Sequence, residues 1–549
     1  MQPAGVTFQC LAEWCTLHQD GVTRQLYSPG SSLKRGKQKT MSTQAHSHSQ
    51  EDQSPGNQSP ASRVTPRDLG LYALIALVVG SMIGGGVFSL PQNIAASASA
   101  GAILIGWLIT GIGMLALAFV YQGLSMRKPH LDAGPYAYAR AGFGDFVGFN
   151  SAWGYWLSAW LGNVSYAVLI FGTLGHFFPM FGSGNTWQAV VGASLVLWLI
   201  HALILMGVRQ AAMANIVTTI AKLVPIFIFV LFVLMAFKGT IFTSEFWGSM
   251  TSTAAPETTP AEGAGLGSIL EQVRSTMLVT LWVFIGIEGA SVVSARAKQR
   301  RDIGRATIAG FLLSLGVYMA VSLFSLGVMN QANLASLPDT ASMADVMRTV
   351  AGDWGDWLIR VGLMVSVGGA FLSWTLFAAE IPYVAAHEGI MPKLFDKQNK
   401  NGSPVASLWI TNGLVQLFLI ITLISQSTYT ALFYIASTAI LVPYVLSGAY
   451  ALRLALTGEA YRPGENRGRD VLVGIVATVY GCWLVYAAGL TYLLMVALLY
   501  APGIIFYWIA RRNSGQVLFR PVEALMALGL LIAASVAAWQ MWIGAISPL

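Results

Sequence analysis

Apolar runs long enough to cross a lipid bilayer follow one another from residue 69 to near the C-terminus. About 20 helical residues, each rising ~1.5 Å, cross the ~30 Å hydrocarbon core. The sequence predicts thirteen spans, and we separate the eleventh from the twelfth at Gly489 because their joint run is about twice one crossing. The spans are 69–95, 101–123, 146–175, 187–206, 211–236, 273–295, 304–328, 357–385, 405–424, 430–456, 471–489, 491–510 and 522–543. Only 10% of the residues are charged, which excludes an ordinary soluble domain.

Basic residues predict the orientation of the chain. Of 31 Lys and Arg residues, 26 fall in the N-terminal tail or in loops on one side of the membrane. Because Lys and Arg resist translocation, we expect the N-terminus in the cytoplasm, and thirteen spans then place the C-terminus on the periplasmic side. The same distribution accounts for the net charge of +7, which therefore gives no reason to expect a nucleic-acid partner.

The first 66 residues form a separate segment. They are rich in Ser, Gln, Pro and Gly, and a segment of this composition cannot bury a core, so we expect a disordered cytoplasmic tail. The tail lacks the charged start, apolar run and cleavage site of a signal peptide. Within it, Met41-Ser42-Thr43 offers an alternative start of the chain.

Two predicted spans contain glycine clusters that indicate breaks in the helix. The first span carries Gly84-Gly85-Gly86, and the sixth carries Gly286 and Gly289 on either side of Glu288. Glycine has a poor helix propensity, and interrupted helices at matching positions of two five-span halves are typical of inverted-repeat transporters. For an isolated glycine pair, close helix packing is the alternative. Three adjacent glycines and a second cluster five spans later favour two broken helices.

Glu288 and Lys222 are ionisable residues in the middle of predicted spans. A charge at the membrane centre costs at least ~2.5 kcal/mol, so each needs a partner or a function. Glu288 is a candidate to gate, to relay a proton or to attract a cation, and the alternative is a structural carboxylate bonded to the first span. Lys222 is a candidate to occupy the place of a driving cation or to exchange a proton.

Large aromatic rings also lie well inside the spans, at Trp282, at Trp374 and in the segment 155–163. Interfacial aromatic belts would place such rings at the span ends. Taken singly, a mid-span Trp packs more often than it binds a ligand. Ring faces attract guanidinium or ammonium groups by about 0.5–2 kcal/mol, so a ring-lined cavity suits a basic organic cation.

Over nearly all of residues 67 to about 545, the chain resembles the amino acid, polyamine and organocation transporter superfamily, specifically its basic amino acid antiporters. The segments that carry the resemblance are 84–86, 155–163, 282–291, 373–380 and 442–444. Within that group, segments 81–86, 131–138 and 159–166 look most similar to the arginine/ornithine antiporters. Thirteen spans also fit that branch.

The resemblance implies an all-α integral membrane protein with a LeuT-like 5+5 inverted-repeat transporter core in which helices 1 and 6 are broken. Residues 67–456 would form this ten-helix core, and residues 457–549 the peripheral helices 11–13. The implied function is secondary transport in the bacterial inner membrane, exchanging extracellular arginine for cytoplasmic ornithine by alternating access, without a cofactor. Both cations carry one net charge, so the exchange would be electroneutral.

The resemblance also implies a substrate site at the two breaks. The implied contacts are Gly85 and Gly86 amides for the carboxylate, Met82, Trp282 and Ile285 carbonyls for the amine, and Trp374, Ser158, Ala159 and Asn163 for the cationic head.

Further roles follow from the same resemblance. Trp282 would close over the substrate from one side, and Glu288, Trp374 and Tyr444 would contribute to a deeper gate. Lys222 resembles a lysine found elsewhere in the superfamily at the sodium position, which implies sodium independence. The chain departs from the related arginine/agmatine exchangers at Gly85 and near Ala436, where a hydroxyl is missing.

Other function classes remain as alternatives. A proton-coupled uptake carrier or exchanger for lysine, histidine or other basic amino acids would use Glu288 or Lys222 as the proton group. A membrane enzyme is disfavoured because the sequence contains no metal-ligand His pair, Ser/His/Asp constellation or phosphate loop, and its three cysteines offer neither a disulfide framework nor a zinc site. Nothing indicates a channel ring, and the oligomeric state, including a homodimer, stays open.

Overall fold

The computed structural model describes residues 71–129, 131, 134–206, 208–248, 266–288, 299–425 and 428–546. The predicted tail 1–66, with its alternative start at Met41, lies outside the described residues, as does the sixth span beyond Glu288. The described chain is helical and contains no strand, only an isolated bridge between Gln398 and Pro404.

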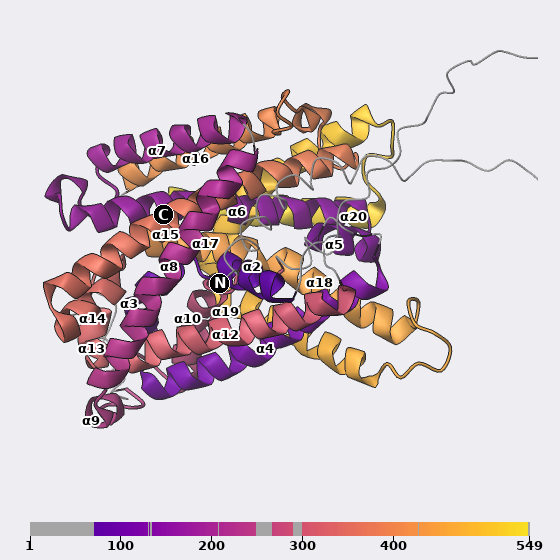
Figure 1. Cartoon of the computed structure of the whole chain (residues 1–549). Coiled ribbons are helices and arrows are strands. Elements are labelled where there is room, and N and C mark those ends of the chain that lie inside the picture. Colours follow the sequence, from indigo (N-terminus) through magenta and orange to yellow (C-terminus); the bar gives the residue numbers. More distant parts are fainter. Residues whose placement is uncertain are drawn as a thin grey trace, which may run out of the picture.

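Figure 1 shows long helices that run side by side, joined by short connecting helices. The elements are α2 (Leu71–Met82), α3 (Gly86–Ala95), α4 (Ala100–Arg127), α5 (Pro135–Phe143), α6 (Asp145–Gly175), η1 (Pro179–Phe181), α7 (Trp187–Met206), α8 (Val208–Ala236), α9 (Gly239–Thr243), α10 (Ile269–Trp282), α12 (Arg300–Ser325), α13 (Gln331–Ala335), α14 (Ser342–Ala351), α15 (Asp353–His387), η3 (Lys393–Asp396), α16 (Val405–Ser425), α17 (Tyr429–Ala439), α18 (Leu441–Thr457), α19 (Gly468–Asn513) and α20 (Pro521–Trp542).

The helices coincide with the predicted spans, apart from the connecting helices. Nine helices within the described residues are long and apolar enough to cross a membrane. One of them is α19, whose 46 residues are divided at Gly489, with φ 77° and ψ 160°, where the sequence predicted a boundary between two spans. The first predicted span is divided into α2 and α3, so neither part has the length of a full crossing.

The tenth predicted span, 430–456, is confirmed as the apolar stretch Tyr429–Thr457, and its helix is interrupted at Ile440 between α17 and α18. Pro443 has no N–H to donate to the carbonyl of Ala439, four residues earlier, so a helical hydrogen bond is missing there. The Tyr500 hydroxyl of α19 donates to this Ala439 carbonyl at 2.8 Å instead. A tertiary partner therefore stabilises a local break.

The contacts between helices repeat after five spans. Helices α6 and α15 are the third spans of the two halves, and α8 and α17 belong to their fifth spans. Helix α6 of the first half packs against α17 of the second half, and α15 of the second half packs against α8 of the first half. The equivalent helices α4 and α12, α6 and α15, and α7 and α16 also pack against each other. This exchange of partners is the pattern of two inverted five-helix repeats.

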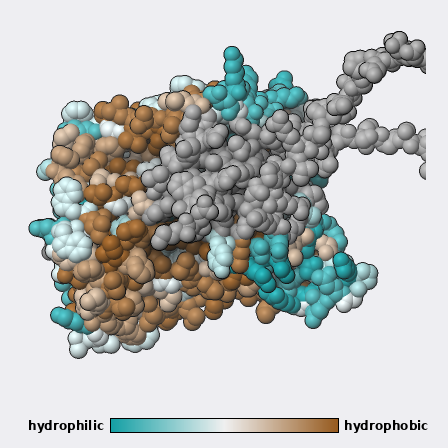
Figure 2. All heavy atoms as spheres, in the orientation of Figure 1, coloured by the Kyte–Doolittle hydropathy of each residue, from teal (hydrophilic) through white to brown (hydrophobic). Residues whose placement is uncertain are grey.

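The surface presents an apolar region next to a polar end. Figure 2 shows hydrophobic residues across the left and middle of one face and hydrophilic residues gathered at the right-hand end. Leu195 and Leu199 of α7 and Leu525 of α20 are among the exposed apolar side chains. Exposed apolar faces of this extent are expected where helices contact lipid.

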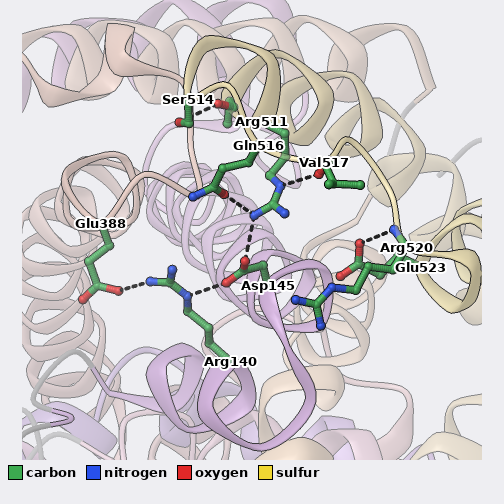
Figure 3. A network of polar contacts seen from close by, with 10 residues as sticks. Arg140, Asp145, Glu388, Arg511, Ser514, Gln516, Val517, Arg520 and Glu523 are labelled. Carbon is green, nitrogen blue, oxygen red and sulfur yellow. Dashed lines mark hydrogen bonds and ion pairs between the residues drawn. The ribbon is translucent and has the colours of Figure 1, made fainter.

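Ion pairs join the connecting helix α5 to α6 and to the end of α15, and join α6 in turn to α19 (Figure 3). Arg140 of α5 places its Nε 2.8 Å from Asp145 Oδ1 at the start of α6 and its Nη1 3.1 Å from Glu388 Oε2 just after α15. The other oxygen of Asp145 lies 2.7 Å from Arg511 Nη1 of α19, and Arg511 also donates to the Gln516 side chain. The Arg511 side chain is only 6% exposed, so salt screens this pair less than a surface pair.

We predict that Gly154→Ala destabilises the packing of α19 on α6. A Cβ atom at Gly154 would lie 1.6 Å from the Tyr500 hydroxyl and 2.7 Å from the Ala439 carbonyl oxygen. Overpacking of this kind costs about 1–3 kcal/mol. The expected result is a lower thermal unfolding midpoint of the purified protein. Gly316→Ala in α12 is the control, because a Cβ there has open space, and equal midpoints for the two variants would contradict the packing described.

Candidate functional site

The two glycine clusters break their helices as the sequence predicted. Helix α2 ends at Met82, residues 83–85 are not helical, and α3 begins at Gly86. Helix α10 ends at Trp282, and residues 283–288 form successive turns. Both breaks leave backbone amides or carbonyls without the bonds of a continuous helix, which makes them available to a ligand.

A side chain of the first break holds the second break in place. The Ser81 hydroxyl lies 3.0 Å from the Gly286 carbonyl oxygen and 2.9 Å from the Val78 carbonyl oxygen, so its hydrogen is shared between the two helices. Gly286 has φ +110°, a conformation that side chains rarely adopt, and a Cβ there would lie 2.9 Å from the Ser81 carbonyl oxygen. Glycine is therefore required at 286 both by its conformation and by the close approach.

A small cavity lies between the two breaks and the helices α6 and α15. Its volume is about 10 Å³, room for about one water molecule. None of the described side chains that line it is charged. The lining residues are Met82, Gly84, Gly86, Ser158, Ala159, Gly162, Tyr166, Trp282, Val283, Ile285 and Trp374.

Most residues expected to bind substrate line this cavity, and two do not. Met82, Gly86, Ser158, Ala159, Trp282, Ile285 and Trp374 line it. Gly85 instead packs against α6 and α15, since a Cβ there would meet Leu169 and Val367 at 2.7 and 3.0 Å. Asn163 is buried and its side-chain amide donates to the Thr375 hydroxyl at 3.2 Å.

Sequence reasoning did not single out four lining residues, Gly84, Gly162, Tyr166 and Val283, as contacts. Helical spacing contained part of the signal: Gly162 and Tyr166 follow Ser158 at intervals of four residues and so share one face of α6. Gly84 and Val283 lie inside the two breaks, where no helical period tells which residue points inward. Their position depends on how the broken ends meet.

The ring of Trp282 forms one wall of the cavity. A Cβ at Gly86 would lie 2.8 Å from the Trp282 ring, so only glycine allows this contact. The ring stacks on Phe433 with a centroid distance of 5.8 Å and lies 5.9 Å from the ring of Tyr166. Its Nε1 donates to the Tyr429 hydroxyl at 3.0 Å.

Glu288 lies at the end of the second break and is almost fully buried, with 1% exposure. Its Oε1 accepts a hydrogen bond from the Tyr155 hydroxyl at 2.5 Å, and its Oε2 accepts one from the Tyr444 hydroxyl at 2.9 Å. Tyr155 belongs to α6 and Tyr444 to α18, so this carboxylate connects the second break with two other helices. The sequence singled out Glu288 and Tyr444 together, whereas the contact of Tyr155 with Glu288 was missed.

Lys222 of α8 is buried, with 4% exposure, and its Nζ donates to the Gly80 carbonyl oxygen at 2.5 Å. Gly80 lies in the last turn of α2, next to the first break. The ammonium group therefore bonds to backbone oxygen beside the break, as a bound cation would. The described residues contain no group of three or more His, Cys, Asp or Glu side chains that could hold a metal ion.

We predict that Gly286→Ala disturbs the meeting of the two breaks. An alanine would adopt a strained φ, at about 1–3 kcal/mol, and would push against the Ser81 carbonyl oxygen. The thermal unfolding midpoint should fall relative to Gly413→Ala in α16, whose added methyl group has open space. An unchanged midpoint for Gly286→Ala would show that the second break tolerates a side chain.

Comparisons with known proteins agree with this architecture. The chain matches the family model described as "Amino acid permease" over residues 69–538. It is 50% identical over 490 residues to the "Arginine/ornithine antiporter" of Pseudomonas aeruginosa, which covers 88% of this chain and 99% of that protein. It is 47% identical over 484 residues to the "Putative arginine/ornithine antiporter" of Escherichia coli (strain K12), with 87% and 100% covered.

A further relative is named for a different amino acid, lysine. The "L-lysine transport protein" of Corynebacterium glutamicum is 41% identical over 499 residues, which are 88% of this chain and 96% of that protein. The family model and the relatives extend over most of the chain and include both broken helices. This chain is therefore a multi-pass membrane protein that belongs to the amino acid permease family.

Proposed function

We propose that this protein exchanges extracellular arginine for cytoplasmic ornithine across the inner membrane of a bacterium. The observation that carries the proposal is 50% identity along 99% of the length of an arginine/ornithine antiporter. The exchange breaks no covalent bond, so it needs neither catalytic residues nor a cofactor. Residues 67–456 are the proposed transport core and residues 457–549 the proposed peripheral helices.

The chemistry of the cavity fits a basic amino acid. The N-terminus of α3 begins at Gly86, and the free amides of a helix N-terminus attract an anion such as the substrate carboxylate. The carbonyls of Met82, Trp282 and Ile285 at the ends of the breaks suit the α-amino group. The ring of Trp374 would attract the cationic head, at about 0.5–2 kcal/mol.

The uncharged lining supports exchange of one cation for another. A carboxylate in the cavity wall would neutralise the charge of a bound cationic substrate. The described lining residues include no Asp or Glu, so the bound substrate keeps its net charge. Arginine and ornithine each carry one net positive charge, so the exchange moves no net charge across the membrane. Because the cavity has room for about one water molecule, its walls must move apart before an amino acid enters.

Two buried charges outside the cavity complete the proposal. Glu288, held by Tyr155 and Tyr444, is the proposed gate on one side of the cavity, since substrate can leave there only if these hydrogen bonds break. The Lys222 ammonium on the Gly80 carbonyl is the proposed replacement of a driving sodium ion. The exchange would therefore run without sodium.

Proton-coupled uptake of lysine is the second candidate function. The identity to an L-lysine transport protein along 96% of that protein supports lysine as a substrate. In this alternative, Glu288 or Lys222 would bind and release the coupling proton, and no counter-substrate would be needed.

An efflux experiment separates the two candidates. Proteoliposomes in sodium-free buffer are loaded with radiolabelled ornithine, and the outside holds buffer alone, arginine, lysine or histidine, at two pH values. We expect efflux only when external arginine is present, because an obligatory exchanger cannot return empty. Efflux into plain buffer that follows a pH gradient would instead support proton-coupled transport.

Replacement of Trp374 tests the binding of the cationic head. We expect Trp374→Ala to raise the half-saturating arginine concentration about twofold to thirtyfold, the equivalent of one cation–π contact. Trp374→Phe keeps a ring and should have a smaller effect. Trp542→Ala is the control, because Trp542 of α20 is 89% exposed. An unchanged half-saturation for a folded Trp374→Ala variant would remove the proposed stacking contact.

A further inference from the structure

The first turn of α17 contacts the Trp282 ring that walls the cavity. Tyr429, the first residue of α17, is fully buried, and its hydroxyl accepts the hydrogen bond of Trp282 Nε1 at 3.0 Å. The next ring on this helix, Phe433, stacks on Trp282. The indole is thus held on its face by one residue of α17 and at its edge by another.

Tyr429 also contacts α3, the second part of the first broken helix. Its hydroxyl oxygen lies 3.2 Å from Ser89 Oγ, and Ser89 Oγ accepts a hydrogen bond from Asn93 Nδ2 at 3.1 Å. All three side chains are buried. The hydrogen bonds therefore run from α10 through α17 to α3 and connect both broken helices on one side of the cavity.

The residue after Tyr429 binds a different segment. Asp339, in the connection between α13 and α14, places its Oδ2 3.2 Å from the Thr430 amide and 2.9 Å from the Thr430 hydroxyl. The helices on either side of this connection contact α3: the Ser342 hydroxyl of α14 accepts a hydrogen bond from the Gln92 amide at 3.1 Å, and Gln331 Nε2 of α13 donates to the Ala95 carbonyl at 2.7 Å. In Figure 1, α3, α13 and α14 lie together at the left, away from α5 and α18.

We propose that Tyr429 and Thr430, here called the α17 latch, hold the Trp282 ring closed over the cavity and couple it to the 331–342 segment. Tyr429 is the positioning residue for the ring, and Thr430 fixes the segment that covers α3. When the ring moves to admit an amino acid, Trp282 Nε1 loses its acceptor and α17, α3 and the 331–342 segment separate together. This inference rests on the proposed function, because it gives the closing step of the same cavity.

The hydrogen bonds of the α17 latch are made by neutral groups, apart from the Asp339 carboxylate that binds Thr430. A hydroxyl that accepts from an indole N–H contributes about as much as other neutral hydrogen bonds, so its loss shifts an opening equilibrium about fivefold. A contribution of this size favours the closed ring and still allows the opening on which transport depends. A buried ion pair at this place would be costlier to break.

Hydrogen–deuterium exchange of the full-length protein in lipid nanodiscs, without substrate, tests the latch. Amide exchange of a folded protein reports how often a segment opens. In Tyr429→Phe, which removes only the hydroxyl, we expect amides of 86–95 and 429–439 to exchange about fivefold faster than in the parent. In Thr430→Val, which removes the hydroxyl bonds to Asp339 Oδ2 at 2.9 Å and to Asn93 Oδ1 of α3 at 3.4 Å, we expect faster exchange in 331–342 as well as in 86–95.

Tyr72→Phe is the matched control, because it removes the same hydroxyl from a tyrosine that is 86% exposed. Parent rates in Tyr429→Phe, or equal acceleration in Tyr72→Phe, would overturn the latch. Parent rates at 331–342 in Thr430→Val would overturn the coupling. Because no amino acid is added, the outcome is independent of the efflux experiment, whose failure would refute the proposed substrates and not the latch.

Discussion

The contact between Ser81 and Gly286 is the constraint on which the site depends. One hydroxyl hydrogen is shared between the carbonyls of Val78 and Gly286, so the end of one broken helix is fixed to the turn of the other. Gly286 can take its φ of +110° and its close approach to Ser81 only because it has no side chain. With the breaks joined in this way, Met82, Gly86 and Ile285 line one cavity.

Tyrosine hydroxyls connect the helices on both sides of this cavity. Tyr155 and Tyr444 donate to the Glu288 carboxylate beyond the second break, and Tyr429 accepts from the Trp282 indole before it. Phenol groups suit such positions, because a ring fills apolar space while its hydroxyl makes a hydrogen bond. Each connection joins a broken helix to α6, α17 or α18, so movement of either break requires the loss of a few hydrogen bonds.

Much of the candidate site could be predicted from the sequence, and the lining residues that were not singled out lie on one face of α6 or inside the two breaks. Trp282, Trp374 and the pair Ser158 and Ala159 lie at positions that the sequence pattern and the family resemblance indicated. Gly85, packed between α6 and α15, and Asn163, which donates to Thr375, do not line the cavity, and their contacts with substrate stay predictions. At a break, a rotation of one residue about the chain exchanges an inward for an outward position, so no periodicity predicted that Gly84 and Val283 line the cavity.

The apolar spans, the two glycine breaks and the split at Gly489 could be predicted from the sequence alone, because these features depend on local composition and on the bilayer thickness. The end of α17 at Ala439 depends in addition on helix packing, because the Tyr500 hydroxyl of a distant helix takes the carbonyl that Pro443 leaves without a partner. Packing also brings Tyr155 to Glu288 and Tyr429 to Trp282. These pairs are more than 130 residues apart, and they meet only when the helices pack into the fold.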